Sequence, residues 1–89
     1  MQRIKIIVYG KVQGVFYRKN TKEIAQELKL NGYVKNLPDG SVLVEAEGDV
    51  ESLEKLRDWC AKGPTAARVD DIEVSWLEPV GYSGFQVKL

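Results

Sequence analysis

The sequence predicts one α+β domain over residues 1–89, in which two helices alternate with the strands of a single sheet. Three observations support this prediction. The length suits a small domain with one core. The hydrophobic content of 44% and the charged content of 29% are those of a globular chain. Finally, the spacing of apolar residues alternates between the period of strands and that of helices.

The first predicted elements are a strand over residues 3–9 and a helix over residues 20–30. Both sets of alternating side chains in the strand are largely aliphatic, so we expect it to be covered on both faces. The helical segment carries an apolar stripe, with charged side chains on the other side. The stripe consists of Ile24, Ala25 and Leu28. This pattern predicts an amphipathic helix packed against a sheet.

The ends of this helix are predicted from residues that favour helix termini. Asn20 or Thr21 can cap its start through a side-chain oxygen, although a start as early as Tyr17 also fits the sequence. Asn31-Gly32 is expected to end the helix, because glycine readily adopts the left-handed backbone that follows many helices.

A β-hairpin is predicted next. Residues 33–37 and 41–47 form its two strands, since apolar and polar side chains alternate in the second of them and both are short. Pro38-Asp39-Gly40 favours a tight turn between them, because proline presets its own φ and glycine accepts a positive one.

A second helix and two strands complete the predicted fold. Asp49 is a favourable cap for the helix, and Gly63-Pro64 ends it. Its apolar stripe consists of Val50, Leu53, Leu56 and Trp59 or Cys60. Residues 69–76 and 85–87 have strand patterns. The order βαββαβ is that of a ferredoxin-like sandwich, an antiparallel sheet with both helices on one face.

Several kinds of chemistry are excluded by residues that the chain lacks. It has no histidine and a single cysteine, which rules out a Ser-His triad, a redox cysteine pair and a thiolate zinc cluster. A cysteine phosphatase needs an arginine six residues after its nucleophile, where Cys60 is followed by Ala66. Alternation and capping explain the acidic residues of 45–49, and Asp70-Asp71 suits a solvated strand start. We therefore expect no metal and no cofactor.

Charge is spread unevenly along a chain whose net charge is zero. The first 40 residues hold eight lysines and arginines against three acidic residues, which either steers a small anion or is ordinary surface charge. A nucleic-acid footprint would be denser than this. No apolar run approaches the roughly 20 residues that span a bilayer, and the N-terminal strand lacks a signal-peptide pattern. We expect a cytoplasmic monomer with no membrane or nucleic-acid partner.

The segment from Val8 to Arg18 is the first candidate for a binding site. Its strand breaks at Gly10, a loop passes Gly14, and Arg18 lies near a possible helix start. Backbone N–H groups, the positive end of a helix and a guanidinium can converge there on one phosphate. The alternative is a surface arginine beside a tight turn.

Asn36 is the second candidate, because asparagine is uncommon in strands yet stands at the end of one here. Its side-chain amide can orient a water for attack, or it can bond to the turn at residues 38–40. The predicted topology allows this strand end to approach the loop at residues 10–18, so that both candidates face one cleft. Trp59 and Trp76 are expected to be core or partly covered aromatics.

Two motifs in the chain resemble those of the acylphosphatase family. The first, aliphatic-x-Gly-x-Val-Gln-Gly-Val-x-Phe/Met-Arg, is matched by residues 8–18 at every fixed position except Tyr17. The second, Gly-aromatic-small-basic-Asn-x-x-x-Gly-x-Val followed six residues later by Gly, is met in full by residues 32–48. Segments 62–64 and 67–69 are also similar, so the resemblance spans nearly the whole chain.

The resemblance implies hydrolysis of the carboxyl-phosphate bond of small acyl phosphates, without a metal, to a carboxylate and inorganic phosphate. It implies that Arg18 and Asn36 are catalytic, with Arg18 on the phosphate and Asn36 on the attacking water. The phosphate-binding residues that it implies are Gln13, Gly14, Val15, Phe16, Tyr17 and Arg18. Inorganic phosphate is then both product and competitive ligand. The missing histidine fits this reaction, because a carboxylate leaves without a general acid.

Two alternatives belong to other classes of protein. One is a non-catalytic ferredoxin-like module that binds RNA or an anionic metabolite, although residues 42–46 lack the paired aromatics of an RNA-binding sheet. The other is an acylphosphatase-like module of the kind that is fused to carbamoyl-transfer enzymes. The length of 89 residues favours a free-standing hydrolase over this alternative. No acyl-specific pocket can be recognised in the sequence.

Overall fold

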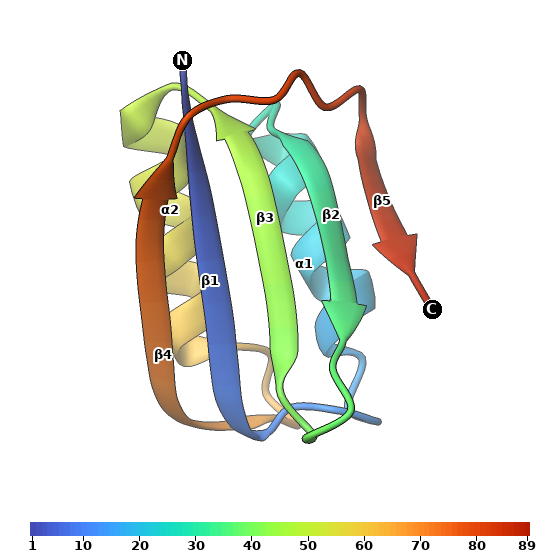
Figure 1. The fold of residues 1–89 in the computed structure, drawn as a ribbon. Helices are drawn as coiled ribbons and strands as arrows, with labels where there is room; N and C mark the ends of the chain where they lie inside the picture. Colours follow the sequence, from blue (N-terminus) through green and yellow to red (C-terminus); the bar gives the residue numbers. More distant parts are fainter.

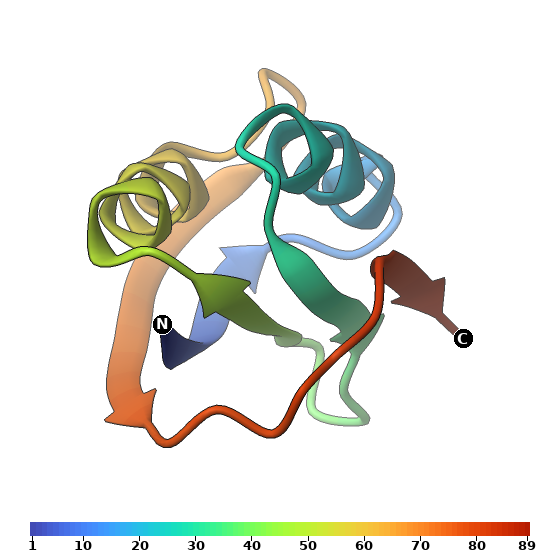
Figure 2. The ribbon, with the colours of Figure 1, turned by 90° about the horizontal axis from the view of Figure 1, so that it is seen from above.

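Five strands form one sheet in the computed structural model, which describes all of residues 1–89 (Figure 1). The strands are β1 (Gln2–Lys11), β2 (Asn31–Asn36), β3 (Val42–Gly48), β4 (Arg68–Leu77) and β5 (Phe85–Lys88), in the order β4-β1-β3-β2-β5 across the sheet. Two helices, α1 (Tyr17–Glu27) and α2 (Val50–Lys62), lie together on one face (Figure 2). The predicted α+β class is confirmed. Neither helix is long and apolar enough to cross a membrane.

The edge strand β5 requires a correction to the predicted antiparallel sheet. The pairs β1–β3, β1–β4 and β2–β3 are antiparallel, but β5 pairs with β2 in parallel. The connection at residues 78–84 explains the difference, because it crosses the sheet at the end where β4 finishes and β2 begins (Figure 1). A strand that starts at this end runs in the same direction as β2. The sheet is therefore mixed.

One hydrophobic core fills the space between the sheet and the helices. Inward side chains of the central strands are fully covered, and the set consists of Ile4, Ile6, Val8, Val42, Val44 and Ala46. Leu53 and Leu56 of α2 are buried against them, as predicted, and Ile24 and Leu28 of α1 are partly buried. Burial of a valine, leucine or isoleucine side chain stabilises the fold by roughly 1.5–3 kcal/mol. The apolar face of the sheet therefore orients both helices.

Helix α1 starts earlier than the predicted caps. Its N-cap is Phe16, whose backbone is left-handed with φ 64° and whose side chain caps nothing. The assignment of Asn20 or Thr21 as the cap is wrong, because both lie inside the helix. The Thr21 hydroxyl donates instead to the carbonyl of Tyr17 at 2.8 Å. The allowed early start at Tyr17 is the one observed.

The C-terminal end of α1 also differs from the prediction, whereas both ends of α2 agree with it. Helix α1 is followed by Lys29 at φ 59°, whereas Asn31-Gly32, predicted to end it, belongs to β2 and pairs with β3. Helix α2 has its predicted ends. Asp49 accepts a hydrogen bond from the N–H of Ser52 at 2.9 Å, and Gly63 follows the helix with φ 73°.

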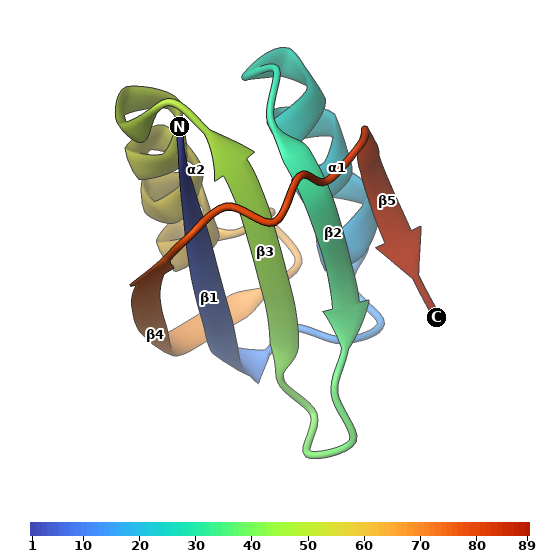
Figure 3. The same cartoon turned by 45° about the horizontal axis from the view of Figure 1, so that its top comes forward.

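Residues 78–84, which we call the strap, cover part of the sheet face opposite the helices (Figure 3). Two buried carboxylates hold it there. Glu47 accepts hydrogen bonds from the N–H groups of Val80, Gly81 and Tyr82. Glu45 accepts from Arg3 at 2.7 Å and from the Tyr82 hydroxyl at 2.9 Å. The strap thus connects β4 to β5 along a fixed path.

Candidate active site

The connection between β1 and α1, residues 12–16, forms an open loop at the N-terminal end of α1. Val12 and Val15 are buried and anchor it to the core. Gly14 and Phe16 both have positive φ, of 74° and 64°. For Phe16 this conformation carries strain of about 1–2 kcal/mol, and its ring is 72% exposed. Strain of this kind is concentrated at ligand-binding sites.

The N–H groups of this loop are free to bind an anion. Those of Gly14, Val15 and Phe16 donate no hydrogen bond within the protein. The first N–H groups of α1, which follow directly, have no partner inside the helix and lie at its positive end. Such a row of donors binds a phosphate or another small oxyanion.

Gln13 belongs to the loop and ties it to the hairpin through its side chain. Its side-chain amide donates to the carbonyls of Leu37 at 2.8 Å and Ser41 at 2.9 Å. The same two residues close the hairpin turn through the N–H of Leu37 and the carbonyl of Ser41. The Gln13 side chain therefore fixes the spacing between the loop and the end of β2, and only its backbone is left for a phosphate.

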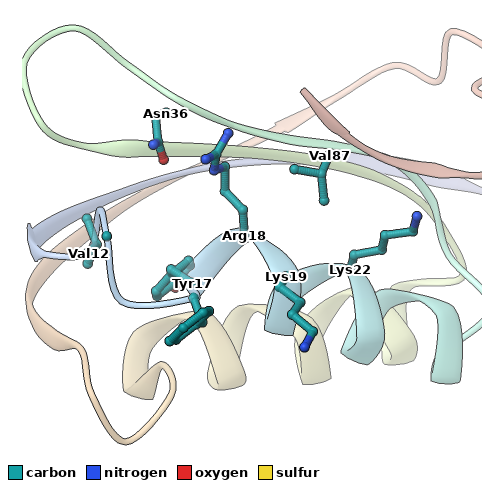
Figure 4. Close-up of a pocket in the computed structure, with 9 residues that line it drawn as sticks. Val12, Tyr17, Arg18, Lys19, Lys22, Asn36 and Val87 are labelled. Carbon is teal, nitrogen blue, oxygen red and sulfur yellow. The ribbon is translucent and has the colours of Figure 1, made fainter. Parts of the chain in front are cut away.

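Arg18 and Asn36 face one cavity of about 490 Å³, to which the loop contributes Gly14 and Phe16 (Figure 4). The Arg18 side chain extends from the first turn of α1, and that of Asn36 points toward it from the end of β2. Lys19 and Lys22 also line the cavity, and no acidic side chain does. The structure thus brings together the two groups that the sequence singled out, in a positively charged setting.

The Arg18 guanidinium is positioned by the last strand. Its Nη1 donates to the backbone carbonyl of Lys88 in β5 at 2.9 Å. Because β5 is held through the strap, this contact depends on residues far from the loop in the sequence. The remaining N–H donors of the guanidinium stay available to a ligand.

Asn36 has an unusual environment. Its side-chain oxygen is buried and has no hydrogen-bond partner in the protein. Nearly all buried polar atoms in proteins have a partner, so this unpaired oxygen marks Asn36 as a candidate functional residue. The alternative of bonding to the turn is not what the structure shows, because Asp39 and Gly40 make the turn's hydrogen bonds.

Tyr17, the departure from the first motif, directs its hydroxyl into the core. The hydroxyl donates to the carbonyl of Cys60 at 2.6 Å, and the ring lies against Trp59 with 5.4 Å between centroids. Burial raises the pKa of the Tyr17 hydroxyl well above its ordinary range and the pKa of the Cys60 thiol to about 12. Both groups are neutral, so Cys60 is no nucleophile.

The sequence did not indicate some features of this site. The pairing of Arg18 with Lys88 joins opposite ends of the chain, and no local pattern predicts it. Lys22 could have been found, because its spacing of four residues from Arg18 places the two side chains on one side of α1. The acidic pair Asp70-Asp71 is outside the cavity, and no cluster of three or more metal-ligating side chains exists in the chain.

Comparison with known proteins agrees with the two motifs. A family model described as Acylphosphatase matches residues 4–87. The acylphosphatase of Thermococcus kodakarensis is 45% identical over 89 residues, covering 98% of both chains. The crystal structure of acylphosphatase from Bacillus subtilis superimposes with a TM-score of 0.96 at 34% identity and covers 100% of both chains.

A larger protein contains a similar module. Full-length HypF, solved in its phosphate- and nucleotide-bound form, matches with a TM-score of 0.87 at 28% identity. The match covers 98% of this chain but only 12% of that chain. The free-standing acylphosphatases match along nearly their whole length instead. With the family model matched over residues 4–87, the same fold and 34–45% identity to these two acylphosphatases, this chain belongs to the acylphosphatase family.

Proposed function

We propose that this acylphosphatase hydrolyses small acyl phosphates in the cavity between the 12–16 loop, Arg18 and Asn36, without a metal ion. The observation that carries the proposal is the convergence of three groups there. They are the unpaired loop N–H groups, the Arg18 guanidinium and the partnerless oxygen of Asn36. No acidic side chain lines the cavity, so its charge is complementary to a phosphate.

The phosphate is bound by the backbone N–H groups of residues 13–18 together with Arg18. For Gln13 the contribution is from the backbone alone, because its side chain is engaged with the hairpin. The guanidinium adds charge-assisted hydrogen bonds, which are about twice as strong as neutral ones. These donors also stabilise the charge that spreads over the phosphoryl oxygens in the transition state.

The Asn36 side-chain oxygen accepts a hydrogen bond from the attacking water and holds it in line with phosphorus. The water oxygen bonds to phosphorus as the bond from phosphorus to the acyl oxygen breaks, and the carboxylate leaves with the bonding electrons. The proton of the water passes to the phosphate product or to solvent. Because the leaving group is a weak base, this step requires no general acid and hence no histidine.

Kinetics of two variants test these roles, with acetyl phosphate as substrate, EDTA present and inorganic phosphate as competitor. Arg18→Ala should weaken phosphate inhibition and lower kcat/KM together. Asn36→Ala should lower kcat by about 10²-fold or more with phosphate inhibition largely kept, the usual loss for one transition-state partner. Arg57→Ala, which removes a cation outside the cavity, serves as the control.

Three results would contradict the proposal. Full activity in Arg18→Ala would remove that residue from the mechanism. Loss of phosphate inhibition with turnover intact in Asn36→Ala would show that Asn36 binds phosphate and does not position water. Abolition of wild-type turnover by EDTA would show that a metal is required.

We further propose that the enzyme acts as a cytoplasmic monomer, with no nucleic-acid or membrane partner. The core is closed within one chain, and its single cysteine is a buried free thiol, which suits a reducing compartment. Basic and acidic residues are equal in number, whereas domains that bind polyanions are usually strongly basic. Analytical ultracentrifugation should give the mass of one chain, and a dimer would contradict the monomer.

A further inference from the structure

A second groove, of about 480 Å³, adjoins the active-site loop on the helix side of the sheet. It runs between α1 and the connection from α2 to β4, which lies beside α1 in Figure 2. Its apolar lining consists of Val15, Phe16, Ile24, Trp59, Pro64 and Ala66. Phe16, which is exposed, also lines the cavity of Arg18 and Asn36, so the two spaces meet at this residue. We call this space the acyl groove.

The geometry of the reaction directs the leaving group toward this groove. In an in-line displacement, the attacking water and the leaving oxygen lie on opposite sides of phosphorus. Asn36, which positions the water, belongs to the sheet layer, whereas the acyl groove belongs to the helix layer (Figures 2 and 4). A phosphate held between Asn36 and the loop therefore carries its acyl group away from the sheet and past Phe16.

We propose that the acyl groove binds the acyl group of the substrate and favours apolar, uncharged groups, aromatic ones above all. This inference rests on the proposed function, since the phosphate must occupy the loop first. The exposed Phe16 ring and the partly buried Trp59 supply flat apolar surfaces. Burial of an aromatic acyl group against them releases water from both surfaces and stabilises the complex.

The rim of the groove adds a charge preference. Glu23 and Glu27 of α1 line it with exposed carboxylates, whereas no acidic side chain lines the phosphate cavity. The two spaces thus differ in the group that each accepts. A dianionic phosphate suits the first, and an acyl group with a second negative charge is repelled from the other.

A binding experiment tests occupancy directly. Trp76→Phe leaves Trp59 as the only tryptophan, so its fluorescence reports on the groove. Benzoylphosphonate, acetylphosphonate and inorganic phosphate are titrated in turn. Benzoylphosphonate should change Trp59 fluorescence and bind at least about ten-fold more tightly than acetylphosphonate, the discrimination typical of an apolar pocket. Equal affinity for the two phosphonates, with no change at Trp59, would overturn the inference.

A charge experiment tests the rim, with benzoyl phosphate and 4-carboxybenzoyl phosphate as paired substrates. The double variant Glu23→Gln/Glu27→Gln should raise the ratio of kcat/KM for the carboxylated substrate over the plain one by about three-fold or more. The control Glu51→Gln/Glu54→Gln makes the same change in net charge on α2, outside both spaces, and should leave the ratio unchanged.

The outcomes separate this inference from the proposed function. If the ratio moves equally in both double variants, the groove has no selective role and the inference is wrong. Acetyl phosphate, whose methyl group is too small to need the groove, reports on the phosphate site by itself. If wild-type protein fails to hydrolyse even acetyl phosphate, the proposed function falls and the inference falls with it.

Discussion

Replacing Glu47 with glutamine should destabilise the fold strongly, although this residue is far from any reacting atom. Glu47 is 1% exposed, and its carboxylate accepts hydrogen bonds from the N–H groups of Val80, Gly81 and Tyr82. A glutamine has one acceptor oxygen, and its amide nitrogen would face N–H donors that it cannot accept from. With about 1.5–3 kcal/mol for each hydrogen bond to a charged group, we expect a loss of about 2–4 kcal/mol.

This loss is a large part of the total stability of a domain, which is about 5–15 kcal/mol. At about 4–8 °C per kcal/mol for a chain of this size, Tm should fall by about 8–32 °C. Urea and thermal unfolding followed by circular dichroism measure both quantities. Glu54→Gln, an exposed carboxylate on the surface of α2, is the control and should stay within about 0.5 kcal/mol.

The effect of Glu47 should also depend on pH. Burial opposes ionisation, but the strap N–H groups outweigh it and lower the pKa of the Glu47 carboxyl below its ordinary value. The ionised group therefore stabilises the fold fully above the unfolded pKa of about 4.3, and this contribution is lost as pH falls through the lower folded pKa. The gap between wild type and variant should narrow in acid. A difference under about 0.5 kcal/mol at neutral pH would show that the strap hydrogen bonds of Glu47 do not stabilise the fold.

Two further predictions concern the contact between the helices. Tyr17→Phe should lower the free energy of unfolding by about 1–3 kcal/mol, because it leaves the buried carbonyl of Cys60 without its donor. Phosphate inhibition should persist in this variant, since the backbone N–H of residue 17 remains. Weakened phosphate inhibition in a folded variant would place the hydroxyl in the site after all. Burial raises the pKa of the Cys60 thiol to about 12, so this thiol should resist a disulfide reagent at mildly alkaline pH until denaturant is added. Rapid labelling of the native protein would show that the Cys60 thiol is not buried.

Features of the fold that depend on neighbouring residues could be predicted from the sequence. The cap at Asp49 and the helix end at Gly63 arise from local hydrogen bonds and from the freedom of glycine at positive φ. The turn at residues 38–40 has the same local origin. The start of α1 could not be predicted in this way, because Phe16 caps it through its backbone and no side chain marks the position.

Features that depend on distant contacts could not be predicted. Gly32 looked like a helix end, but it sits in β2 where a Cβ would collide with the Glu45 carbonyl. Alternation placed Glu45 and Glu47 away from the helices, yet only the strap explains their burial. The parallel direction of β5 follows from the path of the same segment.

In the candidate site too, residues marked by local motifs could be predicted, whereas contacts between distant segments could not. Arg18 and Asn36 could be singled out from motifs, because unusual residue types at fixed spacing mark them. The engagement of the Gln13 side chain with the hairpin and the hold of Lys88 on Arg18 both depend on the folded chain. The acyl groove lies between segments distant in sequence, so no local pattern reveals it.

We propose that the loop N–H groups and Arg18 form the phosphate site beside Asn36. Titration of ¹⁵N-labelled protein with inorganic phosphate, followed through backbone amide resonances, would locate this site residue by residue. The largest shifts should fall on residues 14–18, with a smaller change at the Asn36 side chain, and they should weaken greatly in Arg18→Ala. Saturable shifts centred on another part of the chain, with residues 14–18 unmoved, would contradict the account.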